Sequence, residues 1–168
     1  MIKVECPSPN FSQRHNLINC IVIHDTESKD AKSALSWFSS SDNKVSSHYL
    51  IDKDGTVYQC VAEEKTAWHA GTSSLWSIEN VNDYSIGIEL VDDDDKDPYP
   101  EQQMDSLINL VTELVEKYKI QLNRIVGHEH IATPHGRKKD PGPDFPWYEF
   151  LYCIGARVAN LELGETNK

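Results

Sequence analysis

The stretch INCIVIHD, residues 18–25, is a near-continuous apolar run that ends in a polar pair. Such a run is typical of a strand that is buried on both faces of a sheet. Because side chains alternate along a strand, Cys20, Val22 and His24 should share one face, with His24 at the carboxyl end. Strands of this kind are covered by helices, so the stretch predicts an α/β fold.

The neighbouring sequence supplies further strands for such a sheet. YSIGIELV at 84–91 should turn Gly87 and Glu89 to one face and its larger apolar side chains to the other: Tyr84, Ile86, Ile88 and Leu90. Shorter strands are predicted at 47–52 and 56–61, joined by the hairpin signal Asp54-Gly55, and at 124–128, RIVGH.

Helices are predicted at residues 30–40, at 101–118 and from Trp147 to about Leu161. The second is the clearest, because its apolar residues recur at helical spacing and Pro100 suits a first turn. Strands that alternate with helices predict one α/β domain, with a central mixed sheet flanked by helices on both faces. This domain should span residues 1–168, with a core from about 17 to 161 and short extensions at both ends.

Composition narrows the possible partners and locations. The 168 residues contain 16 Lys plus Arg and 27 Asp plus Glu, so the net charge of −11 opposes binding to nucleic acid or to an anionic membrane. No apolar run is long enough for a membrane span, and the amino-terminal residues lack the apolar stretch of a secretory signal. A cytoplasmic location is therefore expected as synthesised, whereas the oligomeric state is left open.

Two other compositional features have ordinary interpretations. The four cysteines, Cys6, Cys20, Cys60 and Cys153, show no CxxC spacing, and we expect reduced thiols rather than one of the three possible two-disulfide pairings. The acidic segment 92–97 lacks the glycine and the final glutamate of a calcium-binding EF-hand loop, so a solvated loop is predicted there.

Polar residues at the predicted strand ends point to a metal site. His24 ends one strand and His128 another, and open α/β sheets bind ligands outside the carboxyl ends of their strands. Asp140 precedes Pro141, in a loop that Pro143 stiffens further. Two imidazoles and one carboxylate, with a fourth position left to water, form the composition of a catalytic zinc site. Taken singly, a histidine at a strand end is more often structural than a ligand, and an aspartate before proline is usually a turn former.

Three other histidines are weaker candidates. In HEH at 128–130 the HExxH spacing is missing, yet His130 stays a minor candidate for the metal. We expect His15, in a polar leader, to lie at the surface. His135 is also expected at the surface, with a place near the metal as the alternative.

Six segments in order carry a resemblance to a known family: IVIHDT (21–26), VSSHYLIDKDGTVYQ (45–59), AWHAGTSSLW (67–76), NDYSIGIEL (82–90), IVGHEHIA (125–132) and RKKDPGPDFPW (137–147). Together they resemble the zinc-dependent N-acetylmuramoyl-L-alanine amidases of the type-2 amidase family. Peptidoglycan recognition proteins and phage lysozyme-like amidases are relatives of that family. The resemblance covers about residues 17–150 and implies a central mixed sheet flanked by helices.

The resemblance also implies roles for individual residues. His24, His128 and Asp140 match the zinc ligands of the family, Glu89 its acidic catalytic residue and Lys138 its basic one. His69, in WHAG, matches a residue of the substrate groove. The implied reaction is zinc-dependent hydrolysis of the amide between N-acetylmuramic acid and the L-alanine of the peptidoglycan stem peptide. Glu89 would move the proton, with Gly87 leaving room beside its carboxylate, and Lys138 would stabilise the oxyanion.

Further substrate contacts are expected from charge and aromatic character. Arg137 is the candidate for a stem-peptide carboxylate, within a basic cluster that also includes Arg124, Lys138 and Lys139. Trp68, together with Trp76, is a candidate wall of the groove.

The chain departs from the family pattern in two places. The link between the first histidine and VSSHYL is short, as in broad-specificity members, although PSPNF near the start resembles the leader of the cytosolic recycling members. TPHG at 133–136 is about two residues longer than usual. Two other functions stay open: a peptidoglycan-binding module without catalysis, and a zinc peptidase that cuts within the stem. Release as a phage lysin and export as a toxin are the alternatives to a cytoplasmic role.

Overall fold

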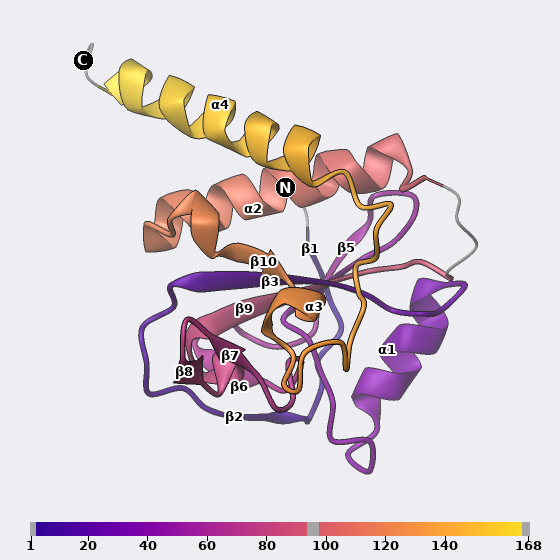
Figure 1. The fold of residues 1–168 in the computed structure, drawn as a ribbon. Coiled ribbons are helices and arrows are strands. Elements are labelled where there is room, and N and C mark those ends of the chain that lie inside the picture. Colours follow the sequence, from indigo (N-terminus) through magenta and orange to yellow (C-terminus); the bar gives the residue numbers. More distant parts are fainter. Residues whose placement is uncertain (1–2, 94–97, 166–168) are drawn as a thin grey trace.

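The apolar run at 18–25 forms strand β3 (Cys20–Asp25), which lies between two parallel neighbours, β9 (Ser85–Leu90) and β10 (Ile125–Gly127). The structure is a computed structural model that describes residues 3–93 and 98–165 (Figure 1). In these residues the central sheet has six strands and continues beyond β9 with β4 (Tyr49–Ile51), β5 (Val57–Gln59) and β1 (Lys3–Glu5). The β4–β5 pair is antiparallel, so the sheet is mixed, as predicted.

The predicted hairpin at Asp54-Gly55 connects β4 to β5. Gly55 has a φ of 85°, and a Cβ placed on it would lie 2.7 Å from the carbonyl oxygen of Gln102. Glycine is therefore required both for the turn and for the close approach of the following helix.

Helices α2 (Glu101–Tyr118) and α4 (Trp147–Glu165) cover one face of the sheet (Figure 1). Their apolar side chains form the main core with residues of β3, β4 and β9: Ile21, Ile23, Tyr49, Ile51, Ile86, Ile88 and Leu90. The bounds of α2 confirm the prediction from helical spacing. α4 continues past the predicted end near Leu161, because Leu and Glu favour the helical conformation.

The opposite face carries smaller elements: α1 (Ala31–Ser39), the 3-10 helix η1 (Val81–Tyr84), α3 (His128–Ile131), and two short antiparallel pairs, β2 (Phe11–Gln13) with β6 (Lys65–Ala67) and β7 (Ser74–Leu75) with β8 (Ile78–Glu79). A further 3-10 helix, η2 (Leu122–Arg124), precedes β10. Asp30 caps α1 by accepting a hydrogen bond from the Ser33 amide at 2.7 Å. Helices therefore lie on both faces of the sheet, as expected.

Two residues belong to other elements than the sequence-based prediction assigned them to. Tyr84 was expected on the face of Ile86, but it ends η1 and packs with Cys20 and Val22 on the opposite face. His128 was expected to end a strand, but it begins α3, because the chain turns after Gly127. Both shifts occur where a strand meets a short helix, which alternation alone does not detect.

The remaining sequence-based expectations concern single features. All four cysteines are free, and Cys20 and Cys60 are buried. Residues 94–97 of the acidic segment lie outside the described residues, so the predicted solvated loop is not described there. In the part of the chain that the structure describes, none of the helices combines the length and apolar character needed to cross a membrane.

Candidate active site

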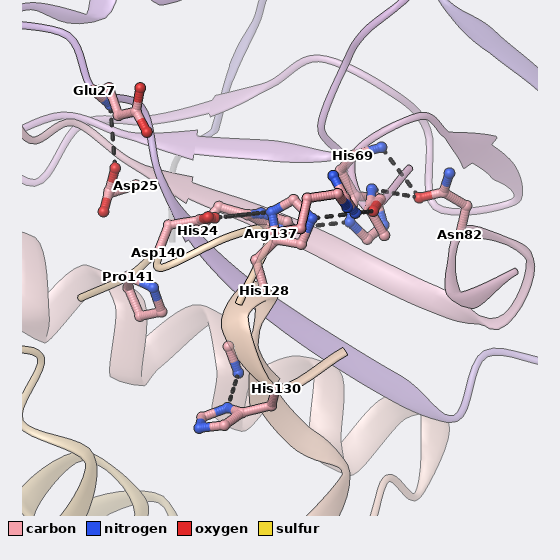
Figure 2. Close-up of polar contacts among 12 residues, drawn as sticks. His24, Asp25, Glu27, His69, Asn82, His128, His130, Arg137, Asp140 and Pro141 are labelled. Atoms are coloured by element: carbon pink, nitrogen blue, oxygen red, sulfur yellow. Dashed lines mark hydrogen bonds and ion pairs between the residues drawn. The ribbon is translucent and has the colours of Figure 1, made fainter. Parts of the chain in front are cut away.

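The carboxyl ends of β9, β3 and β10 place three polar side chains at one edge of the sheet. His24 on β3 is paired in register with Glu89 on β9, and His128 follows β10 directly. Asp140 reaches the same point from the loop before α4 (Figure 2). His24 and His128 lie 104 positions apart in the sequence, and parallel pairing brings them together as expected from strand ends.

His24, His128 and Asp140 form a tight triangle of potential ligand atoms. The Nδ1 atoms of His24 and His128 are 3.1 Å apart, and each lies 3.0 Å from Oδ2 of Asp140. All three residues are buried, and among the described residues they form the group of His, Cys, Asp and Glu side chains that could hold a metal ion. The second carboxylate oxygen of Asp140, Oδ1, is buried without a hydrogen-bond partner in the described part of the chain.

The far nitrogens of the two imidazoles are also engaged. His128 Nε2 lies 3.0 Å from the carbonyl oxygen of Ala70, so it must donate its proton there. His24 Nε2 lies 3.0 Å from Nδ1 of His69 (Figure 2). Each ring is therefore held in place by a hydrogen bond at Nε2, the nitrogen on the far side from the triangle. Hydrogen bonds of this kind orient histidine ligands in metal sites.

Burial favours the uncharged form of His24 and of the neighbouring His69. It lowers the pKa of His24 to about 4, although contact with Asp140 raises it. Burial, together with the positive charge that His24 and His48 would carry, lowers the pKa of His69 well below its ordinary value. For Asp140 burial raises the pKa, but the contacts with His128 and His24 outweigh it, so the carboxylate stays ionised.

Glu89 lies next to this triangle in an unusual environment for a carboxylate. Only 8% of it is exposed, and burial raises its pKa well above the ordinary value. The negative charges of Asp140 and Asp25 raise the pKa further, whereas Lys138 lowers it. This environment favours the protonated form of the Glu89 carboxyl group, as in buried carboxylic acids that transfer protons in catalysis.

A cavity of about 290 Å³ opens over the triangle and has a basic side. Lys44, Arg137 and Lys138 are among its lining residues. A second cavity of about 440 Å³ shares Glu89 and Lys138 with the first and extends to α1. The three potential ligand atoms thus lie at the base of a continuous groove that passes Glu89.

Two of the expected substrate contacts line the first cavity. Trp68 is half-buried there, and its indole Nε1 donates to Ser12 Oγ at 3.3 Å. Arg137 donates to three backbone carbonyl oxygens, those of Ala70, Thr72 and Thr133, at 2.8–3.2 Å. The Arg137 guanidinium is therefore tied to the wall of the cavity.

The structure does not bring the rest of the expected basic and aromatic groups to the site. Arg124 precedes β10, at the amino end of the sheet, where it lies over the exposed Trp76 and donates to Asn19. The basic cluster expected from the sequence is thus divided, because Arg124 and Lys138 lie at opposite strand ends.

The weaker histidine candidates lie away from the triangle. His130 Nδ1 accepts a hydrogen bond from the Gly127 amide at 2.8 Å (Figure 2). The His130 ring packs against Trp147. His15 and His135 are exposed, as expected.

His69 differs most from its expected surroundings. It borders the first cavity with only 6% of its surface exposed, and both ring nitrogens make hydrogen bonds within the protein. Asn82, which the sequence analysis did not single out, accepts the backbone amides of His69 and Ala70 with its Oδ1 at 3.1 and 2.8 Å. It therefore fixes the segment that contacts both His24 and His128. Its place just before a predicted strand was the only available signal.

Comparison with known proteins agrees with this architecture. Residues 13–143 match the model of the N-acetylmuramoyl-L-alanine amidase family. The 1,6-anhydro-N-acetylmuramyl-L-alanine amidase AmpD of Citrobacter freundii is 43% identical over 111 residues, which are 66% of this chain and 58% of that protein. The chain thus aligns with somewhat more than half the length of this curated relative.

Solved structures give the same result at the level of the fold. A crystal structure of an AmpD selenomethionine derivative superimposes with a TM-score of 0.75 at 31% identity, covering 90% of this chain and 93% of that one. The Escherichia coli amidase AmiD, in complex with anhydro-N-acetylmuramic acid-L-Ala-D-γ-Glu-L-Lys, gives a TM-score of 0.74 at 34% identity, covering 81% of this chain and 57% of that one. The resemblance found in the six sequence segments is confirmed, and the chain belongs to the N-acetylmuramoyl-L-alanine amidase family.

Proposed function

We propose that this protein is a zinc-dependent amidase that hydrolyses the bond between N-acetylmuramic acid and the L-alanine of a stem peptide. The observation that carries the proposal is the triangle of His24, His128 and Asp140 at the base of a groove lined by Glu89 and Lys138. Family membership supports the same reaction.

The donor set fits zinc. Zinc bonds to nitrogen and oxygen of about 2.0–2.2 Å, at tetrahedral angles, place neighbouring ligand atoms about 3.3–3.6 Å apart, so binding requires the three side chains to separate by a few tenths of an ångström. The three atoms here are 3.0–3.1 Å apart. Two imidazole nitrogens and a carboxylate oxygen, gathered this closely, are donors of the kind that zinc binds in proteins. Three protein ligands leave a fourth position free, as in catalytic rather than structural zinc sites.

In this mechanism His24, His128 and Asp140 hold the zinc ion. Bound zinc supplies a Lewis acid that polarises the scissile carbonyl and lowers the pKa of water. Glu89 takes a proton from the attacking water and passes it to the nitrogen of the leaving L-alanine, and its raised pKa suits both steps. The Lys138 ammonium group stabilises the negative charge that develops on the carbonyl oxygen.

The charge of the groove supports an orientation for the substrate. The stem peptide carries carboxylates, and we assign it to the cavity lined by Lys44, Arg137 and Lys138. The sugar then extends toward the second cavity, which shares Asp25, Glu89 and Lys138 with the first but has Glu27 in place of Lys44 and Arg137. Trp68 offers an aromatic wall on the peptide side.

We further propose that soluble muropeptides in the cytoplasm, rather than the intact wall, are the preferred substrates. The net charge of −11 opposes accumulation on an anionic polymer. The relatives named for the 1,6-anhydro sugar support the same substrate class.

Mass spectrometry of purified muropeptides incubated with the protein, with and without a zinc chelator, tests this function. Free stem peptide that disappears with chelator, and faster release from soluble muropeptides than from whole sacculi, are the expected results. A shortened stem would indicate a zinc peptidase instead. Intact muropeptide bound by a metal-free protein would indicate a binding module.

A further inference from the structure

A buried row of hydrogen bonds leads from His24 away from the cavity. His24 Nε2 lies 3.0 Å from Nδ1 of His69, and His69 Nε2 lies 3.1 Å from Oγ of Ser85. The Ser85 hydroxyl in turn lies 2.6 Å from the carbonyl oxygen of Val81. His24, His69, Ser85 and Val81 are all buried, so bulk water does not compete for these contacts.

The direction of each hydrogen bond in this row follows from its last member. A carbonyl oxygen only accepts, so the Ser85 hydroxyl donates to Val81 and its oxygen accepts from His69 Nε2–H. The Nδ1 atom of an uncharged His69 is then unprotonated, and it accepts a hydrogen bond from His24 Nε2–H. The remaining nitrogen of His24, Nδ1, therefore carries no proton and faces His128 and Asp140 with its lone pair.

The reverse direction would require a charged His69. Both ring nitrogens of His69 would then carry protons, and Nδ1 would donate to His24. Among the described residues, the His69 ring makes hydrogen bonds with His24 and Ser85 and with no carboxylate. A buried imidazolium without a carboxylate is costly, so the uncharged form and the direction above are favoured.

The fold holds the His69 ring in this place by close packing. A Cβ on Gly87 would lie 2.4 Å from Cγ of His69, so the ring occupies the space of the missing side chain. Asn82 fixes the backbone of His69 from the other side, and the His48 ring contacts the His69 ring edge-on at 5.8 Å between centroids. The ring is thus immobilised against the sheet rather than directed into the groove.

We propose that His69 is a positioning residue for the metal site: through Ser85 and Val81 it holds His24 in the tautomer whose bare Nδ1 binds the metal. This inference rests on the proposed function for the presence of zinc, and it gives His69 a role in metal affinity in place of the expected substrate contact. His128 needs no such side chain, because the Ala70 carbonyl oxygen accepts its Nε2 proton directly.

A matched pair of variants tests the role. Asparagine and leucine have the same branched outline, but only asparagine offers an oxygen near the position of Nδ1. Competition with a chromogenic chelator should show zinc binding weakened about 10- to 100-fold in His69→Leu, the range seen when an outer partner of a ligand is lost. His69→Asn should restore most of this affinity. Equal loss in both variants, or wild-type affinity in His69→Leu with only a raised KM for muropeptide, would overturn the proposal.

A second variant covers the case in which His69→Leu does not fold. Ser85→Ala removes the acceptor of His69 Nε2–H and should weaken zinc binding about two- to tenfold, the equivalent of one hydrogen bond.

Long-range ¹H–¹⁵N NMR spectra of the zinc-free protein report the tautomer directly. They should show His24 protonated at Nε2 in the wild type and mixed in Ser85→Ala. Protonation at Nδ1 in the wild type would contradict the proposal, whereas a wild type that binds no zinc would contradict the proposed function itself.

Discussion

The His69 ring fills the space that a side chain at Gly87 would occupy: a Cβ on Gly87 would lie 2.4 Å from His69 Cγ and 2.6 Å from its Cδ2. Gly87 belongs to β9 and pairs with Val22 of β3, one position along its face from the His24 and Glu89 pair. The sequence suggested that the missing side chain leaves room beside the Glu89 carboxylate. The structure corrects this interpretation, because the imidazole of His69 fills that room.

Gly87→Ala is therefore expected to displace His69 and weaken zinc binding about 10-fold or more, as loss of an outer partner does. Overpacking should also lower the free energy of unfolding by about 1–3 kcal/mol. Chelator competition and urea unfolding measure the two effects. Gly164→Ala is the control, because a Cβ at that helical position meets nothing within 4 Å. Unchanged zinc affinity in Gly87→Ala would show that His69 does not support the site.

His24→Ala should remove zinc binding and activity together, because His24 supplies one of the three proposed ligand atoms and lies next to the other two. Zinc content by mass spectrometry and muropeptide cleavage are the measurements. His130→Ala is the matched control, since His130 caps the Gly127 amide and should leave zinc content unchanged. Full activity of a zinc-loaded His24→Ala protein would refute the assignment.

Glu89→Gln keeps the size of a buried side chain but removes the proton acceptor. We expect turnover to fall about 10²- to 10⁴-fold, the usual contribution of general acid–base catalysis, with zinc affinity within error of the wild type. Single-turnover cleavage of a muropeptide measures the first effect and chelator competition the second. Near-normal turnover in this variant would show that a group other than Glu89 transfers the proton.

Lys138→Met removes the charge beside Glu89 but keeps the aliphatic stem. Turnover should fall about 10²- to 10³-fold, as when one stabilising donor to an oxyanion is lost. The exposed neighbour provides the control, and Lys139→Met should retain turnover. A similar loss in both variants would indicate a general effect of basic charge on substrate binding.

The stability of the zinc-free protein should fall as the pH drops below about 6.5, in part because of His48. Burial lowers the pKa of His48 to about 3, while its ring accepts the Gly87 amide and contacts Lys65. Between these pKa values the unfolded chain binds a proton that the folded chain does not. For such a group, each unit by which the pH falls therefore lowers the free energy of unfolding by about 1.4 kcal/mol. Glu89, with its raised pKa, contributes the opposite slope.

Urea unfolding of the wild type and two variants at pH 7.0 and pH 5.0 isolates the contribution of His48 from those of His24, His69 and Glu89. His48→Gln should reduce the loss of stability between these pH values, whereas His135→Gln, at an exposed position, should not. The same pH dependence in wild type and His48→Gln would contradict the assignment to His48.

Local patterns were enough to predict the main helices and the central strands of the sheet. The apolar spacing of 101–118 predicted α2 at its observed bounds, and Asp54-Gly55 predicted the hairpin. These features depend on neighbours within a few residues, so they are readable from sequence. The six matching segments likewise predicted the family.

Contacts between distant segments were decided only by the tertiary structure. Sequence alone could not show that His69 turns inward to meet His24, 45 positions away, or that Ala70 accepts the proton of His128, 58 positions away. Nor could it show that Arg124 lies at the far end of the sheet from Lys138. The hydrogen-bond partner of a buried polar group is the nearest complementary atom after packing, and packing depends on how the strands are ordered. Sequence by itself determined which residues are candidates for the chemistry, whereas the fold determined that the Nδ1 atom of His24 faces His128 and Asp140.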